Sequence, residues 1–285
     1  MTADNGLQSK KDGAVAAMLR RCAGNVVTAL TILARPARLH PRQPWLPAPQ
    51  QLAIATAAVI AVFLFGIILI DAAAINAVGN LPSFVISAFD WFTDFGKSGW
   101  FLWPLGILFL VLAALPQTLS RASQLVLAAV MVRVGFLFVA IGAPSLFATI
   151  VKRLIGRARP GVSGIVNPAL FDPFQWTPAY ASLPSGHATT AFAVLAAFGA
   201  LWPRARTILL IYALLIAASR IVVTAHYPTD VVAGALVGIA GVLMVRRFFA
   251  LRLLGFSIAA DGALQQYPGP SLSRIKSVAR ELLAK

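Results

Sequence analysis

The 285-residue sequence contains one cysteine, Cys22, and few charged residues. A single cysteine excludes an intrachain disulfide framework and any zinc site built from cysteines. Charged residues make up 12% of the chain, about half the share that is usual in soluble domains. Hydrophobic residues make up 59%, and the mean hydropathy is +0.81. This composition excludes an ordinary soluble domain and indicates a chain that lies largely in lipid.

Acidic residues are also scarce. Nine of them face 24 basic residues, which gives a formal net charge of +15. Such an excess often indicates nucleic acid or an acidic surface as the partner, but basic cytoplasmic loops produce the same excess in membrane proteins. Because no folded nucleic-acid-binding motif accompanies these cations, we expect membrane lipids, and no nucleic acid, as partners.

Long apolar runs are what the sequence does have. A membrane-spanning helix needs roughly 20 mostly apolar residues, and six runs approach or reach that length: 52–70, 99–115, 125–150, 188–202, 208–225 and 231–245. The sequence therefore predicts an all-α fold, a bundle of six transmembrane helices, in which 188–202 is the shortest span. We expect a membrane domain at 51–250, between a basic cytoplasmic segment at 1–50 and a cytoplasmic tail at 251–285.

The positions of the cations predict the orientation. With a cytoplasmic N-terminus, seventeen of the 24 cations lie on the cytoplasmic side and six outside, and Arg133 lies within a span. Basic loops stay in the cytoplasm, so we expect a multi-pass protein of the plasma (inner) membrane with both termini cytoplasmic. Arg133 is expected to reach the inner surface with its long side chain.

Two further segments are expected to lie at membrane surfaces. The apolar run 26–34 is flanked by arginines and predicts an amphipathic cytoplasmic helix on anionic lipid. The segment 81–95 carries five aromatic residues and predicts an interfacial helix, either a plain anchor or part of a lipid entry path.

Three polar stretches fall at the same outer (periplasmic) face in this topology: 152–160, 184–187 and 219–230. Lys152, Arg159 and Arg220 are cations near membrane depth, where unpaired charge is costly. A multiply charged anion is their natural partner, and arginine suits phosphate oxygens. Ser185 and Gly186 open a predicted helix, whose N-terminus also favours an anion. A plain surface for lipid headgroups is the alternative.

The histidines predict a reaction. His40 lies in the basic N-terminal segment and is expected on the surface, whereas His187 and His226 lie beside the cations. Asp230, in the first turn of a predicted helix, can hold one ring nitrogen of His226 and leave the other free for nucleophilic attack. His187 can then protonate the leaving oxygen, which requires opposite protonation of the two rings.

Two alternatives compete with this prediction. Each histidine could be a core or capping residue. His187, His226 and Asp230 could also bind zinc, but the neighbouring cations make a site for a dication electrostatically poor, so no metal and no cofactor is expected.

The combined spacing resembles a known family. Lys152-x6-Arg159-Pro160, Pro184-Ser185-Gly186-His187 and Ser219-Arg220-x5-His226-x3-Asp230 match the three-part signature of the type-2 phosphatidic acid phosphatase/haloperoxidase superfamily at all eleven specified positions. The resemblance covers roughly residues 52–245. Six spans favour its membrane-bound lipid phosphatase branch over the soluble, vanadate-binding branch.

The resemblance implies a mechanism without metal. His226 would attack phosphorus and form a phosphohistidine with the help of Asp230, and His187 would protonate the leaving group. The phosphate oxygens would be held by five residues: Lys152, Arg159, Ser185, Gly186 and Arg220.

Phosphatidic acid, phosphatidylglycerophosphate, undecaprenyl diphosphate and lipid A 1-phosphate are the substrates that the resemblance allows. A lipid phosphotransferase that uses the same intermediate is the alternative enzyme. A lipid-phosphate transporter is disfavoured because the sequence has no inverted repeat.

Overall fold

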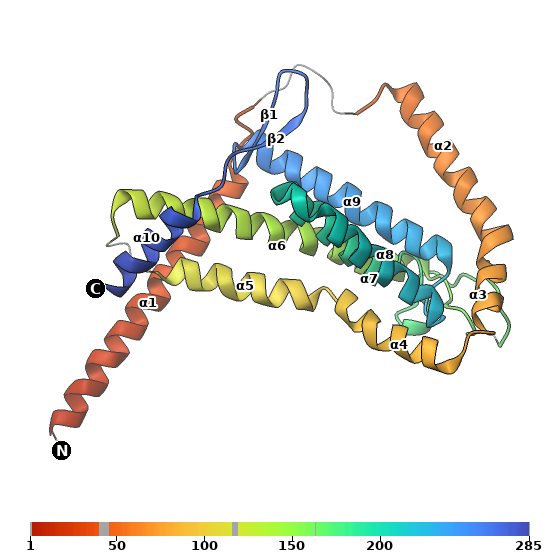
Figure 1. The fold of residues 1–285 in the computed structure, drawn as a ribbon, viewed down its shortest axis with the longest axis horizontal. Helices are drawn as coiled ribbons and strands as arrows, with labels where there is room; N and C mark the ends of the chain where they lie inside the picture. Colours follow the sequence, from red (N-terminus) through yellow and green to blue (C-terminus); the bar gives the residue numbers. More distant parts are fainter. Residues whose placement is uncertain (1, 40–45, 116–118, 163, 285) are drawn as a thin grey trace. The chain divides into compact units, whose positions relative to one another are not determined.

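The computed structural model describes residues 2–39, 46–115, 119–162 and 164–284, so His40 lies outside the described residues. Helices dominate the chain (Figure 1). In chain order the elements are α1 (Thr2–Ala34), α2 (Pro49–Phe65), the π-helix η1 (Gly66–Asp71), α3 (Ala72–Val78), α4 (Ser83–Thr93), η2 (Asp94–Gly96), α5 (Gly99–Ala114), α6 (Arg121–Ile155), η3 (Pro178–Tyr180), α7 (Gly186–Leu201), η4 (Pro203–Ala205), α8 (Arg206–Val222), α9 (Pro228–Leu251), β1 (Phe256–Ile258), β2 (Leu264–Gln266) and α10 (Leu272–Leu283).

The chain forms two compact units, each assembled from segments that are distant in the sequence. The first comprises Met1–His40, Trp103–Phe138 and Arg247–Lys285, and the second comprises Pro41–Leu102 and Val139–Arg246. The backbone is continuous between them within α5, α6 and α9.

The prediction of a mostly helical chain with six membrane-spanning helices is confirmed, but one member of the six differs. Among the described residues, six helical stretches are long and apolar enough to cross a membrane: Val15–Ala34, Pro49–Val78, Ser83–Ala114, Arg121–Ile155, Pro203–Val222 and Pro228–Leu251. Five of them overlap predicted spans. The predicted span 188–202 corresponds to α7, which has 16 residues and is therefore only about 24 Å long. Val15–Ala34 is a further candidate span, where the sequence predicted a helix on the membrane surface.

Helix α7 is a central helix of the second unit. Ten of its residues are buried, and most of these are Ala, Gly or Thr. Small residues also line the face of α9 that meets it: a Cβ atom added at Gly234 would lie 2.4 Å from the Ser185 carbonyl oxygen, and one at Gly238 would lie 2.4 Å from that of Thr189. Backbone-to-backbone packing of this kind is typical of membrane helices. It brings the start of α9 against the start of α7.

The first unit holds the C-terminal tail. Strands β1 and β2 form an antiparallel hairpin, and α10 follows it. The ring of Phe256 packs against Phe136, with 4.7 Å between ring centroids. The Arg133 guanidinium donates hydrogen bonds to the carbonyl oxygens of Tyr267 and Pro268, both at 2.9 Å. Arg133 therefore fixes the tail, a role that the sequence prediction of a surface-seeking side chain had missed.

Candidate active site

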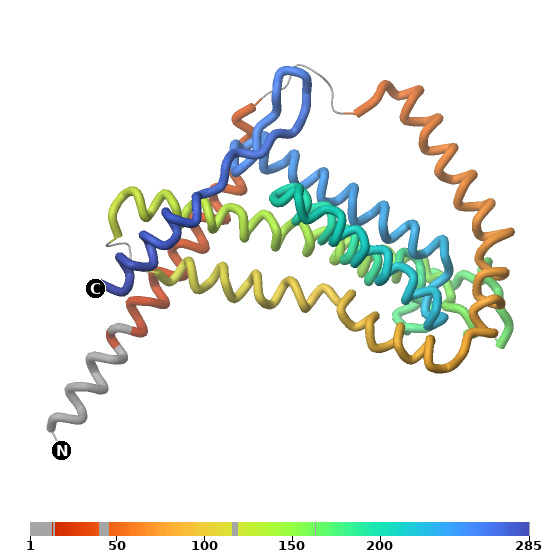
Figure 2. The backbone as a smooth tube through the Cα atoms, viewed as in Figure 1, coloured from red at the N-terminus to blue at the C-terminus, as the bar shows by residue number. Residues whose placement is uncertain are grey.

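The three polar stretches of the sequence meet in the second unit. The Ser185 N–H donates to the Asp230 carbonyl oxygen at 2.9 Å, which joins the start of α7 to the start of α9. A Cβ atom added at Gly186 would lie 3.0 Å from Lys152 Nζ at the end of α6. Figure 2 shows the green segment between α6 and α7 folded beside the blue start of α9. The end of α6 and the starts of α7 and α9 therefore meet at one site.

Gly156 turns the chain out of α6 and into this site. Its φ angle is +64°, as is common for a glycine directly after a helix. A Cβ atom here would lie 1.8 Å from the Asp172 carbonyl oxygen, so any side chain would displace the segment. Beyond it, Ala158 N–H donates to Leu170 O, and Ser182 N–H donates to the Arg157 carbonyl at 3.1 Å. These bonds hold the loop on which Arg157 and Arg159 sit.

His226 lies almost completely buried between α8 and α9, with 1% of its surface exposed. Its Nδ1 atom is 3.7 Å from Asp230 Oδ2, too far for a hydrogen bond. The Ser182 hydroxyl lies between them: it is 3.4 Å from His226 Nδ1 and donates to Asp230 Oδ2 at 2.5 Å. The structure thus places His226 beside Asp230 as the sequence predicted, but with a serine between the two side chains.

The predicted phosphate-binding side chains carry unused donors. Within the described part of the chain, Arg159 Nε, Ser185 Oγ and Arg220 Nε are buried without a hydrogen-bond partner. Ser185 occupies the N-cap position of α7, yet its hydroxyl does not cap the helix, although serine is a favoured capping residue. The first N–H groups of a helix also lack partners within it. These donors fit an anion with several oxygen atoms.

His187 lies in the first turn of α7, close to Gly96 at the end of η2. A Cβ atom added at Gly96 would lie 2.9 Å from the His187 ring. The ring lies within electrostatic range of Lys152, Arg220 and His226. In the residues that the structure covers, no three His, Cys, Asp or Glu side chains are grouped as metal ligands would be.

Helix α4, predicted as an interfacial aromatic helix, also supports the site. Thr93 at its end accepts a hydrogen bond from Arg220 Nη1 at 2.5 Å and one from Ser219 Oγ at 3.0 Å. One guanidinium nitrogen of Arg220, Nη1, thus binds Thr93, whereas Nε has no hydrogen-bond partner among the described residues. Two aromatic side chains of α4 remain exposed, with 70% of Trp91 and 73% of Phe84 accessible.

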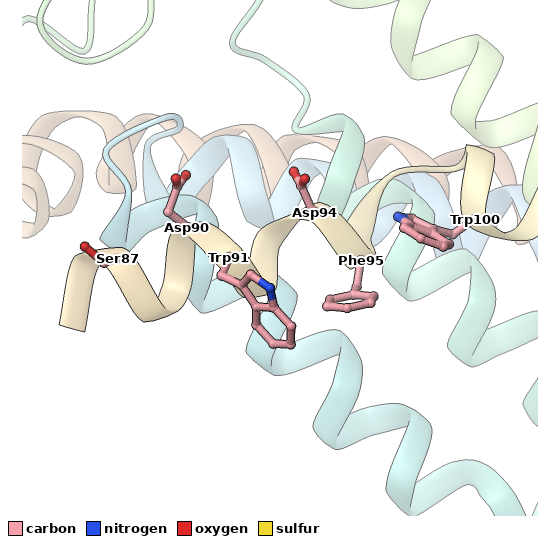
Figure 3. Close-up of a pocket in the computed structure, with 6 residues that line it drawn as sticks. All are labelled: Ser87, Asp90, Trp91, Asp94, Phe95 and Trp100. Atoms are coloured by element: carbon pink, nitrogen blue, oxygen red, sulfur yellow. The ribbon is translucent and has the colours of Figure 1, made fainter. Parts of the chain in front are cut away.

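A hollow of about 460 Å³ lies on α4 and the segment that follows it. Figure 3 shows the Asp90 and Asp94 carboxylates on one side of this helix and the rings of Trp91 and Phe95 on the other. Both carboxylates are within electrostatic range of Arg220. The polar side of the hollow therefore belongs to the surroundings of the site.

Burial controls the titration of the site groups that lie outside the six candidate spans. It lowers the pKa of His226 to about 4, against the opposing effect of Asp230. Burial and, next, the charge of Arg220 lower the pKa of His187 to about 3. Burial also lowers the pKa of Arg159. Both rings are thus neutral near pH 7, whereas the sequence argument required a charged His187.

Sequence reasoning missed a buried charge network behind His226. Asp71, Arg157 and Asp230 are each 0% exposed. Arg157 lies within the polar stretch 152–160 and Asp71 directly follows the apolar run 52–70, but neither was assigned a role from the sequence. An acidic residue at the edge of a membrane helix is itself a signal of function, and it could have identified Asp71. No comparable signal identified Ser182 or Thr93.

Comparisons with known proteins give matches to one superfamily. A sequence model of the PAP2 superfamily matches residues 133–253. The lipid A 1-phosphatase of Rhizobium johnstonii is 37% identical over 171 residues, which cover 60% of this chain and 70% of that protein. The lipid A 1-phosphatase of Rhizobium etli is 35% identical over 182 residues, which cover 64% and 78%.

Two solved structures are also similar. Aquifex aeolicus LpxE is 23% identical with a TM-score of 0.45, and the match covers 62% of this chain and 94% of that one. The first transmembrane PAP2 type phosphatidylglycerolphosphate phosphatase from Bacillus subtilis is 19% identical with a TM-score of 0.44, and the match covers 80% and 95%.

The chain belongs to the PAP2 superfamily. It is a multi-pass membrane protein and a lipid phosphatase of the PAP2 type.

Proposed function

We propose that this phosphatase removes the phosphate group of a lipid through a phosphohistidine on His226. The observation that carries the proposal is the set of buried, unused donors of Arg159, Ser185 and Arg220 beside a histidine whose Nδ1 faces Ser182 and Asp230. Unused buried donors are costly unless they bind something, and a phosphate group offers the oxygen atoms that they need.

The reaction follows from the two ring nitrogens of His226. Because Nδ1 is occupied on the Ser182 side, the Nε2 lone pair is free to attack phosphorus. A P–N bond forms, the P–O bond to the lipid breaks, and the leaving oxygen takes a proton from His187. Water then attacks phosphorus, its proton passes to His187, the P–N bond breaks, and inorganic phosphate leaves. Lys152, Arg159 and Arg220 would stabilise the negative oxygens of both transition states.

The proton on His187 has to arrive with the substrate. Burial keeps the ring neutral near pH 7 in the free protein, but the negative charge of a bound phosphate favours the imidazolium form. A phosphate monoester still carries one proton below its second pKa of about 6. We therefore expect the monoanion to be the form that delivers both the phosphoryl group and the proton.

We further propose lipid A 1-phosphate as the substrate, because the two relatives of 35–37% identity are lipid A 1-phosphatases. The test is phosphate release by purified protein from lipid A 1-phosphate, phosphatidic acid, phosphatidylglycerophosphate and undecaprenyl diphosphate, each in excess chelator. The highest kcat/KM is expected for lipid A 1-phosphate. Loss of all release in chelator would contradict the metal-free mechanism, and radiolabel on an acceptor lipid would indicate a transferase.

We also propose that the site faces outward from the inner membrane and that the C-terminal tail is cytoplasmic, as the distribution of cations predicts. Cys22 is the only cysteine, so a Cys22→Ser background permits single-cysteine labelling. Val162 lies on the exposed loop beside the site, and Leu283 is exposed on α10. Each is replaced by cysteine in a separate variant, Val162→Cys and Leu283→Cys. A membrane-impermeant maleimide added outside intact spheroplasts should label only Val162→Cys. Labelling of Leu283→Cys alone would reverse the orientation.

A further inference from the structure

The strongest unassigned feature is a row of three buried charges behind His226. Arg157 Nη1 is 2.6 Å from Asp230 Oδ1, and Arg157 Nη2 is 2.7 Å from Asp71 Oδ2. The third guanidinium nitrogen, Nε, donates to the Pro168 carbonyl at 2.9 Å, and the guanidinium lies 4.5 Å from the centre of the Tyr227 ring. Every nitrogen of Arg157 is thus engaged with the protein. Among the described residues, Arg159 and Arg220 differ, because each has a buried Nε without a partner.

Stability alone does not explain such a row. Burying ions costs more than their attraction usually returns, and well-packed apolar residues often replace buried ion pairs without loss. The three charges instead fix the positions of the groups that they contact. Asp71 also accepts from the Thr229 N–H at 3.0 Å and from the Thr229 hydroxyl at 2.5 Å, and Thr229 lies in the first turn of α9. Asp71 therefore holds the start of α9 as well as Arg157.

Asp230 is consequently fixed by both of its oxygen atoms. Oδ1 is paired with Arg157, and Oδ2 accepts from the Ser182 hydroxyl at 2.5 Å and from the Tyr227 N–H at 2.9 Å. An ionised carboxylate only accepts, so Ser182 must donate to it. The lone pairs of the Ser182 oxygen then face His226 Nδ1, 3.4 Å away, and can accept only if the ring proton is on Nδ1.

We propose that Asp71, Arg157 and Ser182 are positioning residues that hold His226 in its nucleophilic tautomer. Asp71 and Arg157 fix Asp230. Ser182, whose hydroxyl donates to Asp230, accepts a hydrogen bond from the proton on His226 Nδ1. The proposal rests on the proposed function, because it takes Nε2 of His226 as the attacking atom. It extends the set of functional residues beyond those that the sequence signature specifies.

Ser182→Ala is the mildest test, because it removes one hydroxyl and no charge. We expect kcat to fall about 10²-fold with little change in KM, a smaller loss than the ~10⁴-fold that follows when the carboxylate partner of a catalytic histidine becomes an amide. Ser145→Ala is the matched control: its hydroxyl contacts Thr190 at 3.2 Å elsewhere in the second unit, and its kcat should remain within twofold of wild type. Wild-type kcat in Ser182→Ala would overturn the role of Ser182.

Opposite changes of charge provide a second test. Arg157→Gln removes the cation that offsets Asp230, so the titration midpoint of His226 should rise by about one pH unit. Asp71→Asn leaves Arg157 to act on Asp230 alone, so the midpoint should fall. The charged and titratable groups around His226 include Lys152 on α6, Arg159 after it, His187 on α7, Arg220 on α8, Asp230 on α9 and, through Asp230, Arg157 and Asp71.

The midpoint can be measured without turnover, as deuterium exchange at the imidazole C2 carbon followed by mass spectrometry over a pH series. If Arg157→Gln does not fold, the double variant Asp71→Asn/Arg157→Gln is used in its place, because it removes both members of the buried ion pair. Unchanged midpoints in the charge variants, with unchanged kcat in Ser182→Ala, would overturn the proposal. Failure of wild-type protein to release phosphate from every lipid would instead contradict the proposed function, while the exchange midpoints would still test the row of charges.

Discussion

Arginines in two neighbouring parts of the second unit have opposite surroundings. Behind His226, Arg157 is fully buried and each of its nitrogens contacts Asp71, Asp230 or Pro168. On the other side, Arg159 and Arg220 keep a buried Nε that has no hydrogen-bond partner among the described residues. The difference separates two functions of a buried cation. A cation whose nitrogens all bind protein groups fixes those groups, and a cation with a nitrogen that has no partner is available to a ligand.

The largest expected effect is on stability. Arg157→Met leaves two buried carboxylates without their cation, so the free energy of unfolding in detergent should fall by about 3–5 kcal/mol. Arg159→Met removes a partly unsatisfied cation and should leave that free energy unchanged or raise it. Thermal unfolding of both variants beside wild type provides the measurement. Equal destabilisation by the two substitutions would remove the distinction between the two parts.

A large effect on activity is expected from the two site arginines whose Nε has no partner among the described residues. Arg220→Met should lower kcat/KM by about 10²–10³-fold, as loss of one prepositioned donor to a developing oxyanion does, because it removes the unused Nε beside the proposed phosphate site. Steady-state hydrolysis of the best lipid substrate measures the loss, with unfolding temperature as the control. Activity within threefold of wild type would mean that Arg220 does not contact the phosphate.

A smaller effect is expected from pH. Burial lowers the pKa of His226 to about 4, so the neutral nucleophile persists as the pH falls from 8 to about 5. The proton for His187 arrives more readily over the same interval, because the substrate becomes a monoanion below about pH 6. We therefore expect kcat/KM to rise from pH 8 to about 5.5 and to decline only as the pH approaches 4. A decline that begins near pH 6.5 would show an unperturbed histidine.

The smallest effect is expected where an ion pair is exposed. Lys97 and Asp94 are 2.7 Å apart with side chains that are 56% and 60% exposed, and exposed pairs contribute little. Lys97→Gln should leave the unfolding temperature and kcat unchanged within error. A clear loss of kcat would show that this pair, beside the hollow on α4, takes part in binding the lipid headgroup.

The sequence predicted the spans and the meeting of the three polar stretches because both depend on local patterns. Apolar length identified five of the six candidate spans, and the alternation of the predicted spans placed Lys152, His187 and His226 at one face. Val15–Ala34 is also long and apolar enough to span, although its flanking arginines led to the prediction of a surface helix there, and the predicted span 188–202 is the shorter apolar helix α7.

The network behind His226 could not be predicted in the same way. Asp71 is 158 residues away from Thr229 and 86 from Arg157 along the chain, so their contacts depend on how α2, α6 and α9 pack. Ser182 resembles any loop serine in sequence, and only its position between Asp230 and His226 distinguishes it. Local pattern thus identified the residues that face a ligand, and tertiary packing identified those that support them.

The most direct test of the account is a search for phosphate bound to His226. Purified protein is mixed with ³²P-labelled lipid phosphate in excess chelator, quenched in alkali, digested and analysed by mass spectrometry. The account predicts acid-labile label on the peptide that contains His226, more of it in His187→Ala with a good leaving group, and none in His226→Ala. Full phosphate release by His226→Ala, or label on another residue, would contradict it.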